Sequence, residues 1–99
     1  MKRTVRVLRR ARRDLQEIYD FVAREAPGSA DSVVDGLFDA IESLETMAER
    51  GGRPRDSVLR TAGYRFLVEG TYVVFYKLEG RQVRVYRVLH GRRSRRDLL

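Results

Sequence analysis

The chain contains no cysteine and only one histidine among its 99 residues. The absence of cysteine excludes disulfide bonds and thiolate chemistry, and the scarcity of histidine leaves only carboxylate-type metal sites. The acidic residues form no clustered loop of the kind that such sites use, so neither a metal nor another cofactor is expected.

Long apolar runs are also absent. No segment approaches the roughly 18–20 apolar residues of a membrane span, and the N-terminal residues lead into a mixed segment rather than an apolar signal core. We therefore expect a soluble, cytoplasmic protein that does not associate with membranes. The length is sufficient for one hydrophobic core and too short for two, so residues 1–99 are expected to form a single domain.

The charges are segregated along the chain. Residues 1–13 carry seven basic side chains and no acid, residues 14–49 carry ten acids against one arginine, and residues 50–99 carry thirteen basic side chains against four acids. The folded domain should be dipolar, with a basic pole that attracts phosphates or an acidic protein. The alternative is a solvated, arginine-rich surface without a partner.

The first half of the chain has the hydrophobic pattern of one strand and two helices. Residues 4–8 alternate as a short strand, and residues 11–26 repeat apolar side chains at helical spacing until Pro27-Gly28. Ser29 is a candidate N-cap for a second apolar-striped helix, which we expect to end at Gly51-Gly52.

The second half is predicted to be a loop followed by strands. Residues 53–59 have loop composition, and strands at 63–68, 71–78 and 82–90 are separated by short connections that contain glycine. Residues 71–78 are apolar on both faces and so are expected to form a central strand.

These elements together predict an α+β fold: an N-terminal strand, an α-helical hairpin, then a three-stranded antiparallel meander, with the helices packed on one face of the sheet. The other face would be left open. Because an exposed apolar surface on a small protein usually marks a partner site, a partner chain is expected.

Arg87 interrupts an apolar row, since strict alternation would place it on one face with Val83, Val85 and Leu89. A charge in that position must snorkel to solvent, pair with an acid such as Asp14 or Glu17, or bind a ligand. A structural salt bridge is the favoured interpretation.

His90 ends the same strand. Histidine suits proton transfer near neutral pH, but no nucleophile or orienting acid is evident nearby, which favours a hydrogen-bonded residue at a strand end.

The arginines that follow His90 could bind phosphate or an acidic protein surface, or could be a solvated tail. The strand aromatics could stack on unpaired bases, although alternating aromatics in strands are more often core. They are Tyr64, Phe66, Tyr72, Phe75, Tyr76 and Tyr86.

Three segments carry a family resemblance: ARRDLQEIYDFVAREAPGSA (11–30), GYRFLVEGTYVVFYKLEG (63–80) and VRVYRVLHGRRSRRDLL (83–99). In these segments the chain resembles the ParE/RelE superfamily of toxins from bacterial type II toxin–antitoxin systems. The resemblance implies a helical hairpin on an antiparallel sheet. It also implies a cognate antitoxin, ParD-like and of ribbon-helix-helix type, whose C-terminal segment wraps an apolar groove of the toxin. The complex would bind operator DNA through the antitoxin.

The superfamily has two activities. RelE-like members cleave messenger RNA on the ribosome with several basic side chains, whereas ParE-like members bind DNA gyrase and trap its cleaved-DNA state without catalysis. Arg65 matches the first basic position of the nucleases, but Leu67, Val73 and Asp97 stand where further catalytic groups are expected. The resemblance is therefore closer to the ParE branch, and it implies a gyrase inhibitor with no catalytic residues. The alternative is a ribosome-dependent endoribonuclease that uses Arg65, His90 and Arg92. A third interpretation is a basic nucleic-acid-binding module without toxicity.

Two sets of binding residues follow from these expectations. Contact with gyrase or its DNA is expected from the basic C-terminal half, at Arg65, Arg87, Arg92, Arg93 and Arg96. Contact with the antitoxin is expected from apolar groups of the helical hairpin and the open sheet face, at Tyr19, Val22, Leu59, Phe66, Tyr72 and Val73.

Overall fold

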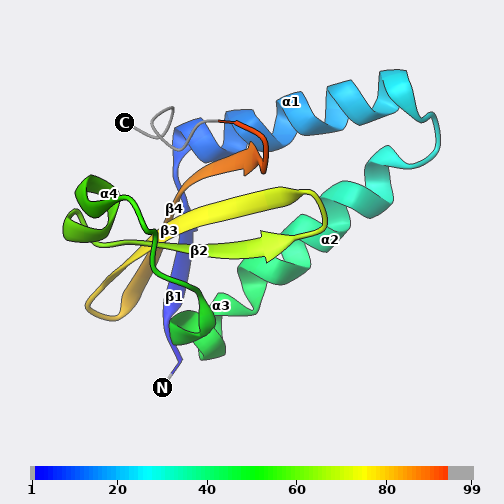
Figure 1. The fold of residues 1–99 in the computed structure, drawn as a ribbon. Helices are drawn as coiled ribbons and strands as arrows, with labels where there is room; N and C mark the ends of the chain where they lie inside the picture. Colours follow the sequence, from blue (N-terminus) through cyan, green and yellow to red (C-terminus); the bar gives the residue numbers. More distant parts are fainter. Residues whose placement is uncertain (1, 94–99) are drawn as a thin grey trace.

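A four-stranded sheet lies at the centre of the computed structural model, which describes residues 2–93 (Figure 1). The strands are β1 (Thr4–Val7), β2 (Tyr64–Glu69), β3 (Tyr72–Glu79) and β4 (Gln82–His90), in the order β1-β4-β3-β2. β1 runs parallel to β4, and the other pairs are antiparallel. The predicted α+β architecture, with an N-terminal edge strand and a meander, is confirmed.

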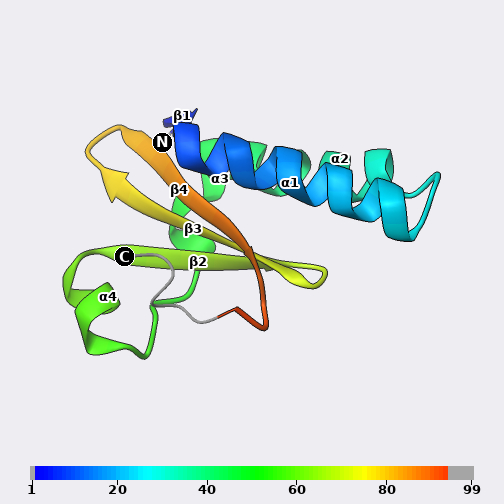
Figure 2. The same cartoon turned by 90° about the horizontal axis from the view of Figure 1, so that it is seen from above.

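Two long helices, α1 (Arg9–Glu25) and α2 (Ala30–Glu42), lie side by side on one face of the sheet (Figure 2). The turn between them needs Gly28, whose φ of +93° is a conformation that side-chain-bearing residues rarely adopt. Ser29 occupies the N-cap position of α2 but makes no capping bond with its side chain. Its backbone is already helical, whereas a capping hydroxyl is normally held by an extended residue.

The second helix ends earlier than predicted. After α2 come two short pieces, α3 (Leu44–Met47) and the 3₁₀ helix η1 (Ala48–Arg50). The Ser43 hydroxyl donates to the carbonyl oxygen of Ala40, and such a bond competes with the backbone hydrogen bonds that continue a helix.

Gly51 and Gly52 do follow the last helical turn, and close packing explains why both are glycine. Gly52 exchanges two backbone hydrogen bonds with Phe66 of β2, with N···O distances of 2.9 and 3.0 Å. A Cβ on Gly52 would lie 2.7 Å from the Phe66 ring, and one on Gly51 would collide with the hydroxyl of Tyr76. The segment thus extends the β2 edge of the sheet.

The prediction of a loop over residues 53–59 is wrong in part, because it contains the start of a short helix, α4 (Ser57–Thr61). Asp56 caps this helix by accepting hydrogen bonds from the backbone N–H groups of Val58 and Leu59, at 2.9 and 3.2 Å. One and a half turns are too short to show helical periodicity, so only the Asp56 cap could have signalled the helix.

The main core lies between the helical hairpin and the sheet. It joins apolar residues of α1 and α2 to Val74 and Tyr76 of β3 and to Val83, Val85 and Val88 of β4. Tyr76 is fully buried, and its hydroxyl donates to the carbonyl oxygen of Ala48 at 2.7 Å. Burial raises the pKa of Tyr76 above its usual value, which keeps the hydroxyl protonated as a donor.

The opposite face of the sheet is partly covered by α4 (Figure 2). Leu59 is fully buried there among Tyr64, Val73, Phe75 and Leu89. The expectation that this face stays open is therefore wrong where α4 lies, because the 53–59 segment that was predicted to be a loop folds back onto it.

β4 contains a bulge at Tyr86. Val85 and Arg87 pair with two consecutive residues of β3, so Tyr86 has no partner of its own. An additional residue reverses the alternation of side chains beyond it, and accordingly Val88 joins the helix-side core while Leu89 joins the second cluster. The expectation that Val83, Val85, Arg87 and Leu89 share one face is wrong.

Asp14 of α1 hydrogen-bonds to the edge of β4 beyond the point where β1 ends. Its Oδ2 accepts hydrogen bonds from the backbone N–H of Val88 at 2.9 Å and from Arg87 Nε at 2.8 Å, and its Oδ1 accepts one from Arg87 Nη2 at 3.2 Å. Both side chains are buried, and Arg10 approaches the same carboxylate as an ion pair at 3.0 Å. The expected structural salt bridge of Arg87 is confirmed, with Asp14 as the acid.

Replacing Asp14 tests this arrangement. Asp14→Ala removes the carboxylate that accepts hydrogen bonds from the buried Arg87 guanidinium and from the Val88 N–H, so the free energy of unfolding should fall by about 3–5 kcal/mol. Urea denaturation measures the loss. Glu17→Ala is the control, because Glu17 is exposed and forms a long ion pair with Arg10, at 3.7 Å. Its cost should stay below about 1 kcal/mol. Equal losses in the two variants would contradict the structural role.

A second prediction concerns the hydroxyl of Tyr76. Tyr76→Phe leaves the Ala48 carbonyl without its donor in the core and should cost about 1–2 kcal/mol in urea denaturation. Tyr86→Phe is the matched control, because the Tyr86 hydroxyl bonds to the exposed Glu79 at 3.0 Å and its loss should be within about 0.5 kcal/mol. A neutral Tyr76→Phe would show that this bond does not stabilise the fold.

Candidate functional site

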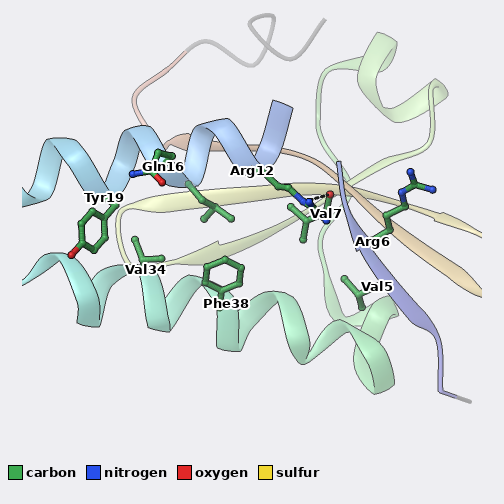
Figure 3. A pocket seen from close by; sticks show the side chains of 9 residues that line it. Val5, Arg6, Val7, Arg12, Gln16, Tyr19, Val34 and Phe38 are labelled. Atoms are coloured by element: carbon green, nitrogen blue, oxygen red, sulfur yellow. Dashed lines mark hydrogen bonds between the residues drawn. The ribbon is translucent and has the colours of Figure 1, made fainter. Parts of the chain in front are cut away.

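An apolar groove of about 710 Å³ lies between β1, α1 and α2 (Figure 3). Its apolar walls are made of six side chains, and we call this set the hairpin groove. They are Val5 and Val7 from β1, Leu15 and Tyr19 from α1, and Val34 and Phe38 from α2.

The groove exists because β1 is short and lies at the sheet edge, while α1 and α2 continue beyond it. Tyr19 and Phe38 remain 36% and 47% exposed there, which is high for aromatic side chains. Monomeric proteins rarely leave neighbouring large apolar side chains uncovered, so the groove has the character of a binding surface.

Polar groups mark the rim of the groove. Arg12 Nε donates to the carbonyl oxygen of Val7 at 3.1 Å and so closes part of the outer edge of β1 (Figure 3). Gln16 donates to Asp20 at 3.0 Å on the exposed side of α1. Asp31 raises the pKa of Tyr19, first through a hydrogen bond with its hydroxyl and then through its charge.

The residues expected to contact the antitoxin are not brought together. Tyr19 lines the hairpin groove, whereas Val22 packs against the main core. The other four lie elsewhere: Leu59 and Val73 are buried in the cluster under α4, Phe66 packs against that cluster, and Tyr72 lines a second hollow.

This second hollow, of about 320 Å³, lies between α1 and the end of β4. Phe21 is 51% exposed at it, and the rings of Tyr72 and His90 meet edge to face, with centroids 5.6 Å apart. His90 Nδ1 accepts a hydrogen bond from the backbone N–H of Arg92 at 3.1 Å. The interpretation of His90 as a hydrogen-bonded residue at a strand end is confirmed.

The basic residues expected at the target surface are also dispersed. Arg65 lies on β2 and donates to the carbonyl oxygen of Glu49 at 3.4 Å, and Arg87 is buried against Asp14. Arg92 and Arg93 are exposed after β4, and Arg96 lies outside the described residues.

The three residues of the nuclease alternative, Arg65, His90 and Arg92, do not form one cluster. Arg92 follows His90, but Arg65 pairs in register with Tyr76, whereas His90 pairs with Tyr72. Four strand residues correspond to about 13 Å along β3, and Arg65 and His90 also lie on opposite sides of that strand. The backbone therefore separates Arg65 from the other two.

Sequence reasoning missed most of the hairpin groove. Val5, Leu15, Val34 and Phe38 fit the strand and helix patterns as ordinary core positions, and periodicity does not tell which core positions remain uncovered. The shortness of β1 was the available signal, because a strand of four residues cannot cover a hairpin of much longer helices.

Residues 2–93 contain neither a membrane-spanning helix nor a cluster of metal ligands. No helix in that range combines the length and the apolar character needed to cross a membrane. Its acidic residues and its histidine nowhere form a group of three that could hold a metal ion.

Comparison with known proteins agrees with the fold and with the resemblance noted in the sequence. The family model described as the ParE toxin of the type II toxin–antitoxin system, parDE, matches residues 5–95. The curated protein Toxin ParE1 of Caulobacter vibrioides is 33% identical over 85 residues, which cover 86% of this chain and 85% of that protein.

Solved structures show the same fold. A chain of the chromosomal ParDE toxin–antitoxin system from P. aeruginosa superimposes with a TM-score of 0.77 at 22% identity, covering 90% of this chain and 96% of that one. A chain of the toxin–antitoxin complex RelBE2 from Mycobacterium tuberculosis gives a TM-score of 0.63 at 27% identity, covering 91% of this chain and 99% of that one. The family model that matches residues 5–95 and the 33% identity to Toxin ParE1 show that this chain belongs to the ParE family of type II toxin–antitoxin toxins.

Proposed function

We propose that this toxin inhibits DNA gyrase by binding it and trapping the cleaved-DNA state, and that a cognate ParD-like antitoxin holds it inactive. Membership of the ParE family is the observation that carries the proposal. The dispersed positions of Arg65, His90 and Arg92 support a binding mechanism over transesterification, since RNA cleavage needs several groups converging on one phosphate. A gyrase inhibitor acts in the cytoplasm.

The hairpin groove is the surface that we assign to the antitoxin. Its apolar walls and the exposed rings of Tyr19 and Phe38 suit an amphipathic segment that lays its apolar face between α1 and α2. Arg12 at the rim would favour an acidic side chain on that segment. The structures of the ParDE and RelBE2 systems come from proteins described as toxin–antitoxin assemblies, which is consistent with a covering partner.

Purified protein tests the proposed target. With gyrase, ATP and supercoiled plasmid, increasing amounts of the toxin should convert plasmid into protein-linked linear DNA, because a trapped intermediate cannot religate. Electrophoresis after protease treatment measures the linear fraction, and gyrase alone is the control. If an excess of toxin yields no cleaved DNA, while the toxin cleaves messenger RNA on ribosomes, the target is the ribosome.

A variant of Phe38 tests the antitoxin surface. Phe38→Glu places a charge in the hairpin groove without disturbing the core, because the ring is half exposed. The affinity for the cognate antitoxin should weaken at least about 30-fold, which is the effect of losing a central aromatic anchor. Calorimetry measures the affinity.

Phe21→Glu is the matched control, because Phe21 is similarly exposed on α1 but lines the other hollow. Its affinity for the antitoxin should stay within about threefold of wild type. Equal weakening by the two variants, or none by Phe38→Glu, would remove the hairpin groove as the main antitoxin site.

A further inference from the structure

The sheet carries a row of basic side chains on the face that is turned away from α1 and α2. In the strand register Arg6 lies beside Arg84, Arg84 beside Lys77, and Lys77 beside Tyr64. Val5 and Val7 pack against the main core, so Arg6 between them points to the opposite face of the sheet, although it also borders the hairpin groove at the edge strand. We call Arg6, Arg84 and Lys77 the basic row.

Such a row is unfavourable in the isolated protein. Adjacent strands are about 4.8 Å apart, and like charges directly opposite each other on neighbouring strands destabilise a sheet. The charge of Arg84 is compensated by an ion pair with Glu79, with 3.3 Å between Arg84 Nε and Glu79 Oε1. The Lys77 ammonium lies 4.5 and 4.9 Å from the ring centroids of Tyr64 and Tyr86. Within residues 2–93 no carboxylate lies within ion-pair distance of Arg6 or Lys77.

The segment around α4 extends the positive charge on this face. Phe66 belongs to this side of the sheet, and Arg53 and Arg55 line a hollow beside its ring. Arg60 lies on α4 itself and is exposed. Of the carboxylates here, Asp56 is engaged in capping α4. Among residues 2–93, the basic row and the segment around α4 together contribute more basic than acidic side chains. They are Arg6, Arg53, Arg55, Arg60, Lys77 and Arg84, with Asp56 and Glu79.

The helical side of the molecule carries most of the exposed acidic side chains, although α1 also has arginines, most of them near its N-terminal end. α2 bears exposed acidic side chains along its length, and α1 adds more toward its C-terminal end. They are Asp20, Glu25, Asp31, Asp35, Asp39 and Glu42. A polyanion would therefore be attracted to the sheet face and repelled from the acidic surface of α2, so the charge distribution would also orient it.

We propose that the sheet face carrying the basic row binds the phosphate backbone of duplex DNA. This inference rests on the proposed function and deepens it: the toxin would hold the DNA that gyrase has cleaved as well as the enzyme. Cations in a line across a sheet match a continuous polyanion, whereas the side chains that anchor a protein partner cluster in well-packed, desolvated pockets. Here the tyrosine rings lie under Lys77 and so support the cation.

The test compares two triple variants with the same loss of charge. Arg6→Gln, Lys77→Gln and Arg84→Gln together remove the basic row, and the control removes three exposed arginines of α1, by Arg9→Gln, Arg13→Gln and Arg24→Gln. Binding of a short DNA duplex of arbitrary sequence is measured by fluorescence anisotropy over a range of salt concentrations. Unchanged melting temperatures establish that both variants are folded.

Loss of the basic row should weaken duplex binding on the order of tenfold more than the control does, and should reduce the slope of log affinity against log salt by about 2–3, near 0.9 for each phosphate contact. If the two triple variants have the same affinity and slope, or if the wild type does not bind duplex at low salt, the inference is overturned.

Gyrase assays separate this inference from the proposed function. If the wild-type protein binds duplex DNA through the basic row but never traps the cleaved-DNA state of gyrase, the inference is supported and the proposed function is contradicted. A basic-row variant that loses affinity for DNA-free gyrase while keeping its affinity for duplex would show that the face binds an acidic protein surface, which contradicts the inference.

Discussion

The carboxylate of Asp14 is the contact on which the arrangement of the two layers depends. β1 covers only the first part of β4, and beyond it the edge of β4 needs an acceptor for the Val88 N–H and an acid for Arg87. Asp14 supplies both from α1, at distances of 2.8–2.9 Å through one oxygen. Because the bulge at Tyr86 lies beside this contact, the helix, the edge of the sheet and the reversal of faces in β4 are fixed together.

This geometry separates the surfaces of the molecule. The helical hairpin extends past the short β1 and leaves the hairpin groove uncovered, with Tyr19 and Phe38 exposed in it. The other side of the sheet is divided between α4, which buries Leu59, and the basic row. Acidic side chains gather on α2 and the C-terminal part of α1, and the basic row lies on the sheet face, so an apolar partner and a polyanionic partner would meet different faces of a small domain.

Much of the fold could be predicted from the sequence, because periodicity and glycine-containing turns report on local geometry. The range of β4 and the two faces of β3 follow from alternation, and a salt bridge of Arg87 follows from the cost of a buried charge, although the sequence did not distinguish Asp14 from Glu17 as the acid. The features that were missed depend on contacts distant in sequence. α4 is too short to show a period, the bulge is set by pairing with β3, and the hairpin groove depends on the length of β1 relative to the helices.

The central claim is that Asp14 and Arg87 act as one unit that joins α1 to the edge of β4. A double-mutant cycle in urea, with Asp14→Ala, Arg87→Met and the combined variant, measures the coupling between them. The coupling free energy should be about 1.5–3 kcal/mol, as expected for buried hydrogen bonds between charged groups. Losses that add to within about 0.5 kcal/mol would contradict this claim.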